Sequence, residues 1–398
     1  MTRSAIRPRI PAGTLVSLTP VNDTTSDGRA LPQSTAITIV VPTYQEAENL
    51  PLLIERIARV RDEHALDIDV LIMDDDSRDG SAEWIAGRAE PWVRLIVRTA
   101  DRGLSAAVLD GLQRARGEVL VCMDADLSHP PESVPDMLRK IALGADFVMG
   151  SRYVEGGKTA DDWGVLRWLN SRFATLLARP LTTLRDPMAG FFALPRATLD
   201  AGRDFNPIGY KIGLELIVKC RCERVVEVPI TFENRRFGES KLNFRQQLLY
   251  LQHLRRLYIY KFGVWSQLAQ FLVVGAAGTL VNLAALTSLI AVRTPLRIAI
   301  ALAIVTAMTF NFVLNRRFSF SFARTGSWWR QYLRYAAASS VGALINYAGT
   351  MLTLARAPEL RPQVAALVGV ACGLAANFIA SRYLVFRAVH VKTGSDGS

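Results

Sequence analysis

The sequence is poor in cysteine and has no CxxC pair. Only four cysteines occur among 398 residues, at positions 122, 220, 222 and 372. So few thiols in so long a chain exclude a disulfide framework and favour reduced side chains. A hydrophobic fraction of 50% also excludes a disordered or collagen-like chain. The chain is therefore long and apolar enough to bury the cores of two or three domains.

Acidic residues are almost absent after position 240. Residues 240–398 hold two of them, Glu359 and Asp396, against 17 Lys and Arg, whereas residues 1–239 hold 34 acidic and 30 basic residues. A nucleic-acid-binding protein usually carries its positive excess on a soluble domain. Here the excess lies between apolar runs, which points to a membrane and away from nucleic acid.

Four stretches contain no charged residue. They are residues 262–292, 298–315, 335–355 and 362–381, and they are 18 to 31 residues long. A helix needs about 20 apolar residues to cross a bilayer, and core helices of soluble proteins seldom lack charge on every face. The sequence therefore predicts four transmembrane helices.

The flanking charges predict the orientation. Basic residues gather before the first span, between the second and third, and at the end of the fourth. The positive-inside rule then places both termini and the soluble part in the cytoplasm, in a multi-pass protein of the cell (inner) membrane. The N-terminus offers no apolar signal region, and residues 1–34 are expected to form a flexible tail.

The apolar part repeats itself. Residues 271–282 (FLVVGAAGTLVN) resemble 335–346 (YAAASSVGALIN), and residues 311–316 (NFVLNR) resemble 377–382 (NFIASR). The offsets are 64 and 66 residues, which predicts two similar helix pairs. The recurring asparagines favour hydrogen bonds between helices, with lipid or substrate handling as the alternative.

The preceding part alternates apolar strands with helical patterns. Strands are expected at residues 36–41, 69–73, 94–98, 118–123 and 146–149, and helices at 46–61 and 104–115. This alternation predicts an α/β fold with a mainly parallel sheet covered on both faces. Ligands of such sheets bind outside the carboxyl ends of the strands.

Three polar clusters follow strands directly. They are residues 42–46 (PTYQE), residues 74–80 (DDDSRDG) and the pair Asp124 and Asp126. Carboxylates spaced in this way can hold Mg²⁺ or Mn²⁺, which prefer oxygen ligands and also bind phosphates. Asp74 and Asp75 could accept hydrogen bonds from a base or a ribose, and Tyr44 could stack on a base.

Two further stretches are amphipathic, with aromatic and basic residues together. Residues 163–179 and 244–262 could lie in the plane of the lipid headgroups, with arginines over phosphates. The alternative is a pair of core-packing helices.

The motifs together resemble a known family. The ordered pieces VPTYQEAENL, MDDDSRDGS, MDADLSHPPE, MGSRYVEGG, DPMAGFF, GYKIGLELIVK and ENRRFGESKL lie between residues 37 and 250. They resemble inverting family-2 glycosyltransferases, and among these the polyprenyl-phosphate (dolichol-phosphate) mannose synthases. The repeat resembles a GtrA-like membrane domain. The resemblance implies a GT-A, Rossmann-like domain over residues 35–243, an interface helix over 244–262 and a four-helix transmembrane domain over 263–390.

The resemblance also implies roles for individual residues. The donor-binding residues would be Pro42, Tyr44, Glu46, Ile72, Asp74, Asp75, Asp124, Ala125, Asp126, Arg152, Arg235 and Lys241. Mg²⁺ or Mn²⁺ would be held by Asp124, Asp126 and Ser128, where Ser128 stands in place of a glutamine common in the family. The catalytic residues would be Asp126, Arg152, Arg167, Ser171 and Lys241.

The expected activity is transfer of mannose from GDP-mannose to a polyprenyl (dolichyl) phosphate with inversion. An acceptor phosphate is already ionised near neutral pH, so the reaction needs no strong general base. One alternative is transfer of glucose or another sugar from a UDP donor. Another is a non-catalytic translocase of lipid-linked sugars, or its regulator. The oligomeric state stays open.

Overall fold

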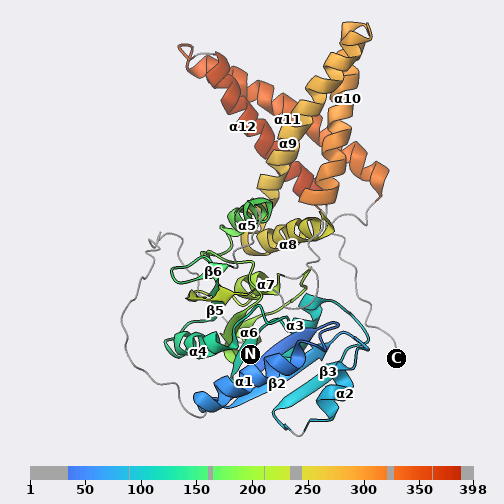
Figure 1. Cartoon of the computed structure of the whole chain (residues 1–398). Coiled ribbons are helices and arrows are strands. Elements are labelled where there is room, and N and C mark those ends of the chain that lie inside the picture. The colour runs from blue at the N-terminus through green and yellow to red at the C-terminus, as the bar shows by residue number, and fades with distance from the viewer. Residues whose placement is uncertain are drawn as a thin grey trace, which may run out of the picture.

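The computed structural model describes residues 35–88, 90–159, 165–209, 211–233, 244–320, 327–360 and 362–386. The tail expected at residues 1–34 lies outside them. A sheet domain forms one end of the molecule and a group of long helices the other (Figure 1). Helices α5 (Val165–Ala178) and α8 (Phe244–Phe262) lie between these two parts. The two amphipathic stretches of the sequence are therefore helices at the junction.

The sheet has seven strands in the order β3-β2-β1-β4-β7-β5-β8. Six of them run parallel, and β7 lies antiparallel between β4 and β5. The strands are β1 Ile37–Thr43, β2 Ile68–Asp74, β3 Val93–Val97, β4 Val119–Cys122, β5 Phe147–Ser151, β7 Phe192–Pro195 and β8 Val225–Pro229. A separate two-stranded sheet pairs β6 Lys158–Thr159 with β9 Thr231–Phe232. The predicted mainly parallel sheet is confirmed, and this is a GT-A, Rossmann-like arrangement.

Helices cover both faces of the sheet because side chains on both faces of its central strands are apolar. Ile39 and Ile72 face the side covered by α1 (Leu50–Glu63) and α4 (Val134–Ala142). Val40 and Leu71 face α3 (Leu104–Arg114) and α7 (Ile212–Lys219) on the other side. The shorter helices are α2 Ser81–Ala86, η1 Pro131–Ser133 and α6 Arg196–Ala201. The helix expected from residue 46 begins instead at Leu50, because residues 46–49 form a turn.

The C-terminal part consists of two helical hairpins. The first joins α9 (Val264–Ala291) to α10 (Leu296–Leu314), and the second joins α11 (Trp328–Arg356) to α12 (Pro362–Ala380). Both hairpins end in a π-helix, at Asn315–Ser319 and Ser381–Val385. These matched endings lie 66 residues apart, as the sequence repeat predicts. Within the described residues, α9 is the one helix whose length and hydropathy suffice for a membrane span.

The recurring asparagines lie against glycines of the neighbouring helix. A Cβ at Gly278 would overlap the carboxamide of Asn311, and a Cβ at Gly342 would overlap that of Asn377. The Oδ1 atoms of both asparagines are buried and accept no hydrogen bond from the described residues. These side chains therefore fill the close approach between two helices, and hydrogen bonding between helices by the recurring asparagines stays a prediction.

Candidate active site

The three polar clusters meet at one edge of the sheet. Strand β1 lies between β2 and β4 and is parallel to both, so the carboxyl ends of all three strands point the same way. Thr43 pairs with Asp74 across the end of β1 and β2. Asp124 begins the loop just after β4. The strand order therefore brings the three clusters to one edge of the sheet.

Asp74 ties the first two clusters together. Its carboxylate is 3% exposed and accepts hydrogen bonds from Thr43 Oγ1 at 3.0 Å, from the Ser77 backbone N–H at 2.9 Å and from the Ser77 hydroxyl. Ser77 Oγ in turn accepts from the backbone N–H of Gln45 at 2.9 Å. Asp74 therefore fixes the shape of both loops, and its contact with a donor stays a prediction.

Asp75 binds the loop that precedes α3. It forms a buried ion pair with Arg98 and accepts from the Gly103 backbone N–H at 2.7 Å. Arg102 donates to the Asp75 carbonyl oxygen, and its guanidinium lies 5.4 Å from the centre of the Tyr44 ring. Tyr44 is 44% exposed, so an aromatic face beside a cation lies open at the edge of the sheet.

The Asp124–Ser128 turn supplies oxygen atoms of the kind that bind hard cations. Leu127 has a positive φ of 63°, which turns the chain so that Ser128 meets Asp126. Asp126 Oδ1 accepts from the Ser128 backbone N–H at 3.1 Å and from its hydroxyl at 2.5 Å. Ala125 between the two acids is buried, while the Asp124 side chain is 32% exposed. Two carboxylates and a hydroxyl at one strand end fit Mg²⁺ or Mn²⁺ in their chemistry.

His129 supports this turn from behind. Its Nδ1 accepts a hydrogen bond of 3.0 Å from the Asp124 backbone N–H, so this nitrogen carries no proton. The ring is 2% exposed and stacks on Phe191 at 5.3 Å. His129 therefore holds the turn through a hydrogen bond to the backbone and a stacked ring.

Arg152 follows β5 and faces a buried carboxylate. Its Nε and Nη2 donate to Asp186 Oδ2 and Oδ1 at 2.7 and 2.9 Å, and Asp186 is 0% exposed. Burial lowers the pKa of Arg152 and the hydrogen bonds to Asp186 raise it, with a net increase. The guanidinium is thus held charged and oriented at the same sheet edge as Asp124, since β4 and β5 both run antiparallel to β7.

The loop from Asp186 to Gly190 lies against Arg152 and Asp124. The Asp186 backbone N–H donates to Glu227 Oε1 at 2.9 Å. Lys211 Nζ donates to the Met188 carbonyl oxygen at 2.7 Å. Burial and the nearby charge of Arg152 lower the pKa of Lys211 to about 8. A positive charge and a fixed loop therefore stand behind Arg152.

Helix α5 reaches the site through Ser171. The Ser171 hydroxyl lies 3.0 Å from the Tyr153 hydroxyl, one residue beyond Arg152. Arg167 also belongs to α5, but its side chain lies outside the described part of the structure, as do Arg235 and Lys241 altogether. The Tyr153–Ser171 contact places Ser171 beside the residue that follows Arg152, and the roles of all five of these residues stay predictions.

Several residues of the site were not singled out from the sequence. Ser77, Arg98 and Gly103 shape the loops after β1, β2 and β3, and Asp186 and Lys211 hold Arg152 and the 186–190 loop. Asp186 and Lys211 lie within the matched pieces DPMAGFF and GYKIGLELIVK, so the motifs carried a signal for both. Pro42 and Ile72 lie in β1 and β2 behind these loops, and Glu46 accepts from Asn49 Nδ2 at 2.6 Å.

Comparison with known proteins assigns the family. A model described as glycosyl transferase family 2 matches residues 38–202, and one described as GtrA/DPMS, transmembrane domain matches residues 270–386. A dolichol-phosphate mannosyltransferase of Pyrococcus furiosus is 35% identical over 355 residues, covering 88% of this chain and 99% of the relative. The chain belongs to this family of glycosyltransferases. The family-2 glycosyltransferase described here is therefore an enzyme with a GtrA-type membrane domain.

Other relatives match the catalytic domain of this glycosyltransferase. A dolichol-phosphate mannosyltransferase of Saccharomyces cerevisiae is 44% identical over 235 residues, covering 56% of this chain and 88% of the relative. An undecaprenyl-phosphate mannosyltransferase of Micrococcus luteus is 38% identical over 216 residues, 51% of this chain and 86% of the relative. Among solved structures, a glucosyl-3-phosphoglycerate synthase of Mycobacterium tuberculosis matches with 20% identity and a TM-score of 0.45, covering 57% of this chain and 80% of that one.

Proposed function

We propose that this glycosyltransferase transfers mannose from GDP-mannose to a polyprenyl phosphate, with inversion, at the cytoplasmic face of the membrane. The printed names of the relatives support mannose as the sugar and a polyprenyl phosphate as the acceptor. The basic residues flanking the apolar helices support the cytoplasmic side.

One observation carries the proposal. Asp124 and Asp126, which could hold the metal ion of a nucleoside diphosphate, lie at the same sheet edge as Arg152. The Tyr153–Ser171 contact links Arg152 to α5. Helices α5 and α8 face the membrane part (Figure 1), and their outer sides expose apolar residues such as Phe173, Leu176 and Leu251. A lipid lying along these helices could present its phosphate to the site without leaving the bilayer.

The reaction is a single displacement. An oxygen of the acceptor phosphate attacks the anomeric carbon of the sugar, and the bond from that carbon to the diphosphate oxygen breaks on the opposite side. The electron pair leaves with the nucleoside diphosphate, so an α-linked donor gives a β-linked product. Positioning and charge stabilisation then supply the catalysis.

The residues divide this work by position. Arg152, held as a fork by Asp186, suits the oxygens of a phosphate. Tyr44 and Arg102 offer a stacking surface to the base. Asp124 and Asp126 would hold a divalent metal, with Ser128 orienting Asp126. When bound, that metal supplies positive charge to offset the leaving diphosphate.

A donor panel tests this assignment. Membranes containing the protein receive labelled GDP-mannose, UDP-glucose or UDP-GlcNAc, each with polyprenyl phosphate and Mg²⁺ or Mn²⁺. We expect label in the organic extract from GDP-mannose alone. Label from a UDP donor would replace the donor assignment and keep the mechanism. No lipid-linked label from any donor would refute the proposal and favour the translocase or regulator alternative.

Asp126→Asn tests the metal assignment directly. The amide keeps the size of the side chain but weakens a metal ligand, so transfer should fall below detection while the thermal unfolding midpoint changes little. Asp62→Asn, an exposed acid at the end of α1, is the matched control and should transfer normally. Undiminished transfer by Asp126→Asn would refute the metal site.

A further inference from the structure

A buried contact between a histidine and a carboxylate joins helix α8 to helix α7. His253 Nε2 on α8 lies 2.7 Å from Glu215 Oε2 on α7, and the two residues are 0% and 1% exposed. The other carboxylate oxygen of Glu215 lies 2.8 Å from Lys219 Nζ and accepts from the Asn206 backbone N–H at 2.6 Å. Burying a carboxylate costs free energy that an apolar side chain would not. Apolar packing alone could hold α8 against α7. The contact between Glu215 and His253 additionally fixes how the two helices are oriented.

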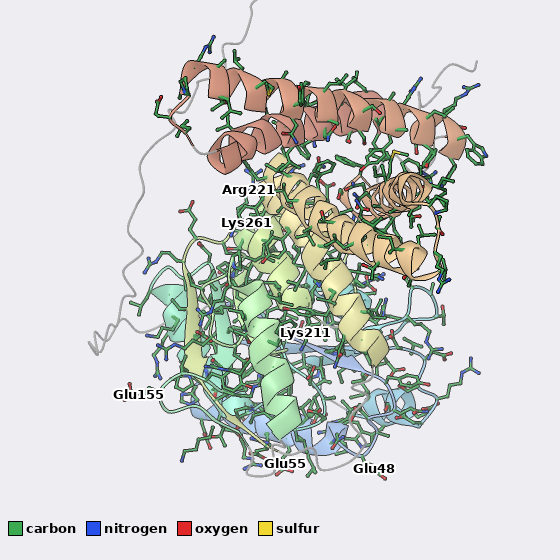
Figure 2. The ribbon with its side chains drawn as sticks, turned by 90° about the horizontal axis from the view of Figure 1, so that it is seen from above. Glu48, Glu55, Glu155, Lys211, Arg221 and Lys261 are labelled. Carbon is green, nitrogen blue, oxygen red and sulfur yellow. The ribbon has the colours of Figure 1, made fainter. Side chains whose placement is uncertain are left out.

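Helix α8 is joined to α5 by side-chain hydrogen bonds. The hydroxyls of Tyr250 and Tyr258 donate to the carbonyl oxygens of Ala174 and Leu177, both at 2.8 Å. Lys261, at the end of α8 (Figure 2), donates to carbonyl oxygens just after α5. The Leu177 carbonyl belongs to the last turn of α5, where helix ends leave backbone acceptors open. The two helices that face the membrane thus form one unit, seated on α7.

The start of α7 reaches the catalytic loop. Lys211 immediately precedes the helix and lies four residues, about one helical turn, before Glu215. Its Nζ donates to the Met188 carbonyl oxygen at 2.7 Å. In the view from above, Lys211 projects between the ribbons of α5 and α8 (Figure 2). One short helix therefore contacts the membrane-facing unit and the 186–190 loop.

The 186–190 loop touches two groups of the proposed active site. At its start, Asp186 accepts both hydrogen bonds from the Arg152 fork. At its end, a Cβ placed on Gly190 would lie 3.4 Å from both carboxylate oxygens of Asp124, so the backbone there runs against that acid. A shift of this loop would move Arg152 and change the space beside Asp124.

We propose that Glu215 and His253 are positioning residues, which seat the α5–α8 unit on α7 and thereby hold the 186–190 loop against Arg152 and Asp124. This inference rests on the proposed function for its kinetic consequence. Its structural consequence, a loop whose order depends on a contact at the membrane-facing side of α7, can be measured without any substrate.

Hydrogen exchange of the full-length protein tests the structural consequence. His253→Leu removes the contact, His253→Gln can still donate to Glu215, and His64→Leu changes an exposed histidine at the end of α1. We expect exchange of peptides covering residues 185–191 to rise about tenfold in His253→Leu. It should return towards the wild-type rate in His253→Gln and stay unchanged in His64→Leu.

Transfer kinetics test the positioning role. A shift of the 186–190 loop would misplace Arg152 and the space beside Asp124 relative to the reacting atoms, so kcat should fall about tenfold in His253→Leu, with a smaller rise in the KM for GDP-mannose. A merely structural role would reduce only the amount of folded enzyme, and kcat per folded protein would then stay at the wild-type value in His253→Leu.

A second variant protects the test against misfolding. Lys211→Met breaks the other end of the path, and it should also raise exchange at residues 185–191. If the two contacts act through α7, the double variant should exchange about as fast as either single variant rather than multiplicatively faster. Wild-type exchange in folded His253→Leu or in folded Lys211→Met would overturn the inference. Failure of the wild-type protein to transfer any sugar would refute the proposed function alone, because the exchange result would still stand.

Discussion

At the scale of single residues, the Ser128 hydroxyl orients a predicted metal ligand. It donates to Asp126 Oδ1 at 2.5 Å in a pocket where Ser128 is 1% exposed. Loss of a group that orients a metal ligand typically costs 10- to 100-fold in metal affinity or activity. We therefore expect Ser128→Ala to raise the metal concentration for half-maximal transfer about tenfold. Ser128→Thr keeps the hydroxyl and should lie nearer the wild type, and superimposable titration curves for all three proteins would contradict this.

The charge of Glu215 makes one residue-scale contact depend on pH. Burial raises the pKa of Glu215, but hydrogen bonds from His253, Lys219 and the Asn206 backbone outweigh it, and the pKa is lowered. A carboxyl group with a lowered folded-state pKa stabilises the fold above its unfolded value of about 4.3, and this contribution is lost as the pH falls through the folded value.

Thermal unfolding at several pH values measures this contribution. At pH 7 the unfolding midpoint of Glu215→Gln should lie below that of the wild type, and the gap should shrink as the pH falls below about 4. Glu90→Gln, which breaks a local, partly exposed pair with Arg88, should change the midpoint little at any pH. A gap that widens on acidification would contradict the assignment.

At the scale of elements, each hairpin of the membrane domain depends on a glycine. Gly278 and Gly342 leave room for Asn311 and Asn377, and a methyl group there would collide with the carboxamide. Gly275, one turn earlier on α9, has nothing within 4 Å of a built Cβ. Gly278→Ala and Gly342→Ala should therefore lower the thermal unfolding midpoint of the detergent-solubilised protein, because helix packing must shift. Gly275→Ala is the matched control, and an equal effect of all three changes would refute the packing argument.

The sequence predicted those strands and helices whose residue pattern is visible within a few neighbouring positions. Strands β1, β2 and β4 each end in a polar cluster, and the apolar period and the polar step after it are both visible within a few residues. Strand β7 is four residues long, and its antiparallel place between β4 and β5 follows from the fold of the whole sheet. The same holds for side-chain pairs. Arg152 and Asp186 are 34 residues apart, and Glu215 and His253 are 38 apart, so no spacing rule connects them. His253 looked unremarkable in the sequence for this reason.

At the scale of the whole molecule, the two hairpins point away from the sheet domain. The loops that join α9 to α10 and α11 to α12 lie at the far end of the helices, whereas the start of α11 lies near α8 (Figure 1). A helix of 28 residues such as α9 is about 42 Å long, which exceeds the roughly 30 Å of a hydrocarbon core. By their lengths alone, α9 and α11, which has 29 residues, allow the hairpin loops to lie on the opposite side of a membrane from the sheet domain, and this placement stays a prediction.

Thiol labelling of intact cells tests this placement. In a protein whose four cysteines are replaced, Glu359→Cys puts a thiol in the loop between α11 and α12, and Arg330→Cys puts one at the exposed start of α11. With the catalytic domain in the cytoplasm, a membrane-impermeant maleimide should label position 359 in intact cells and position 330 only after the membrane is opened. The reverse pattern would place the catalytic domain outside. Labelling of both positions in intact cells would mean that α11 does not cross the membrane. Because the donor is a cytoplasmic nucleotide sugar in the proposed reaction, only the first pattern lets the site at Asp124 and Arg152 meet its substrate.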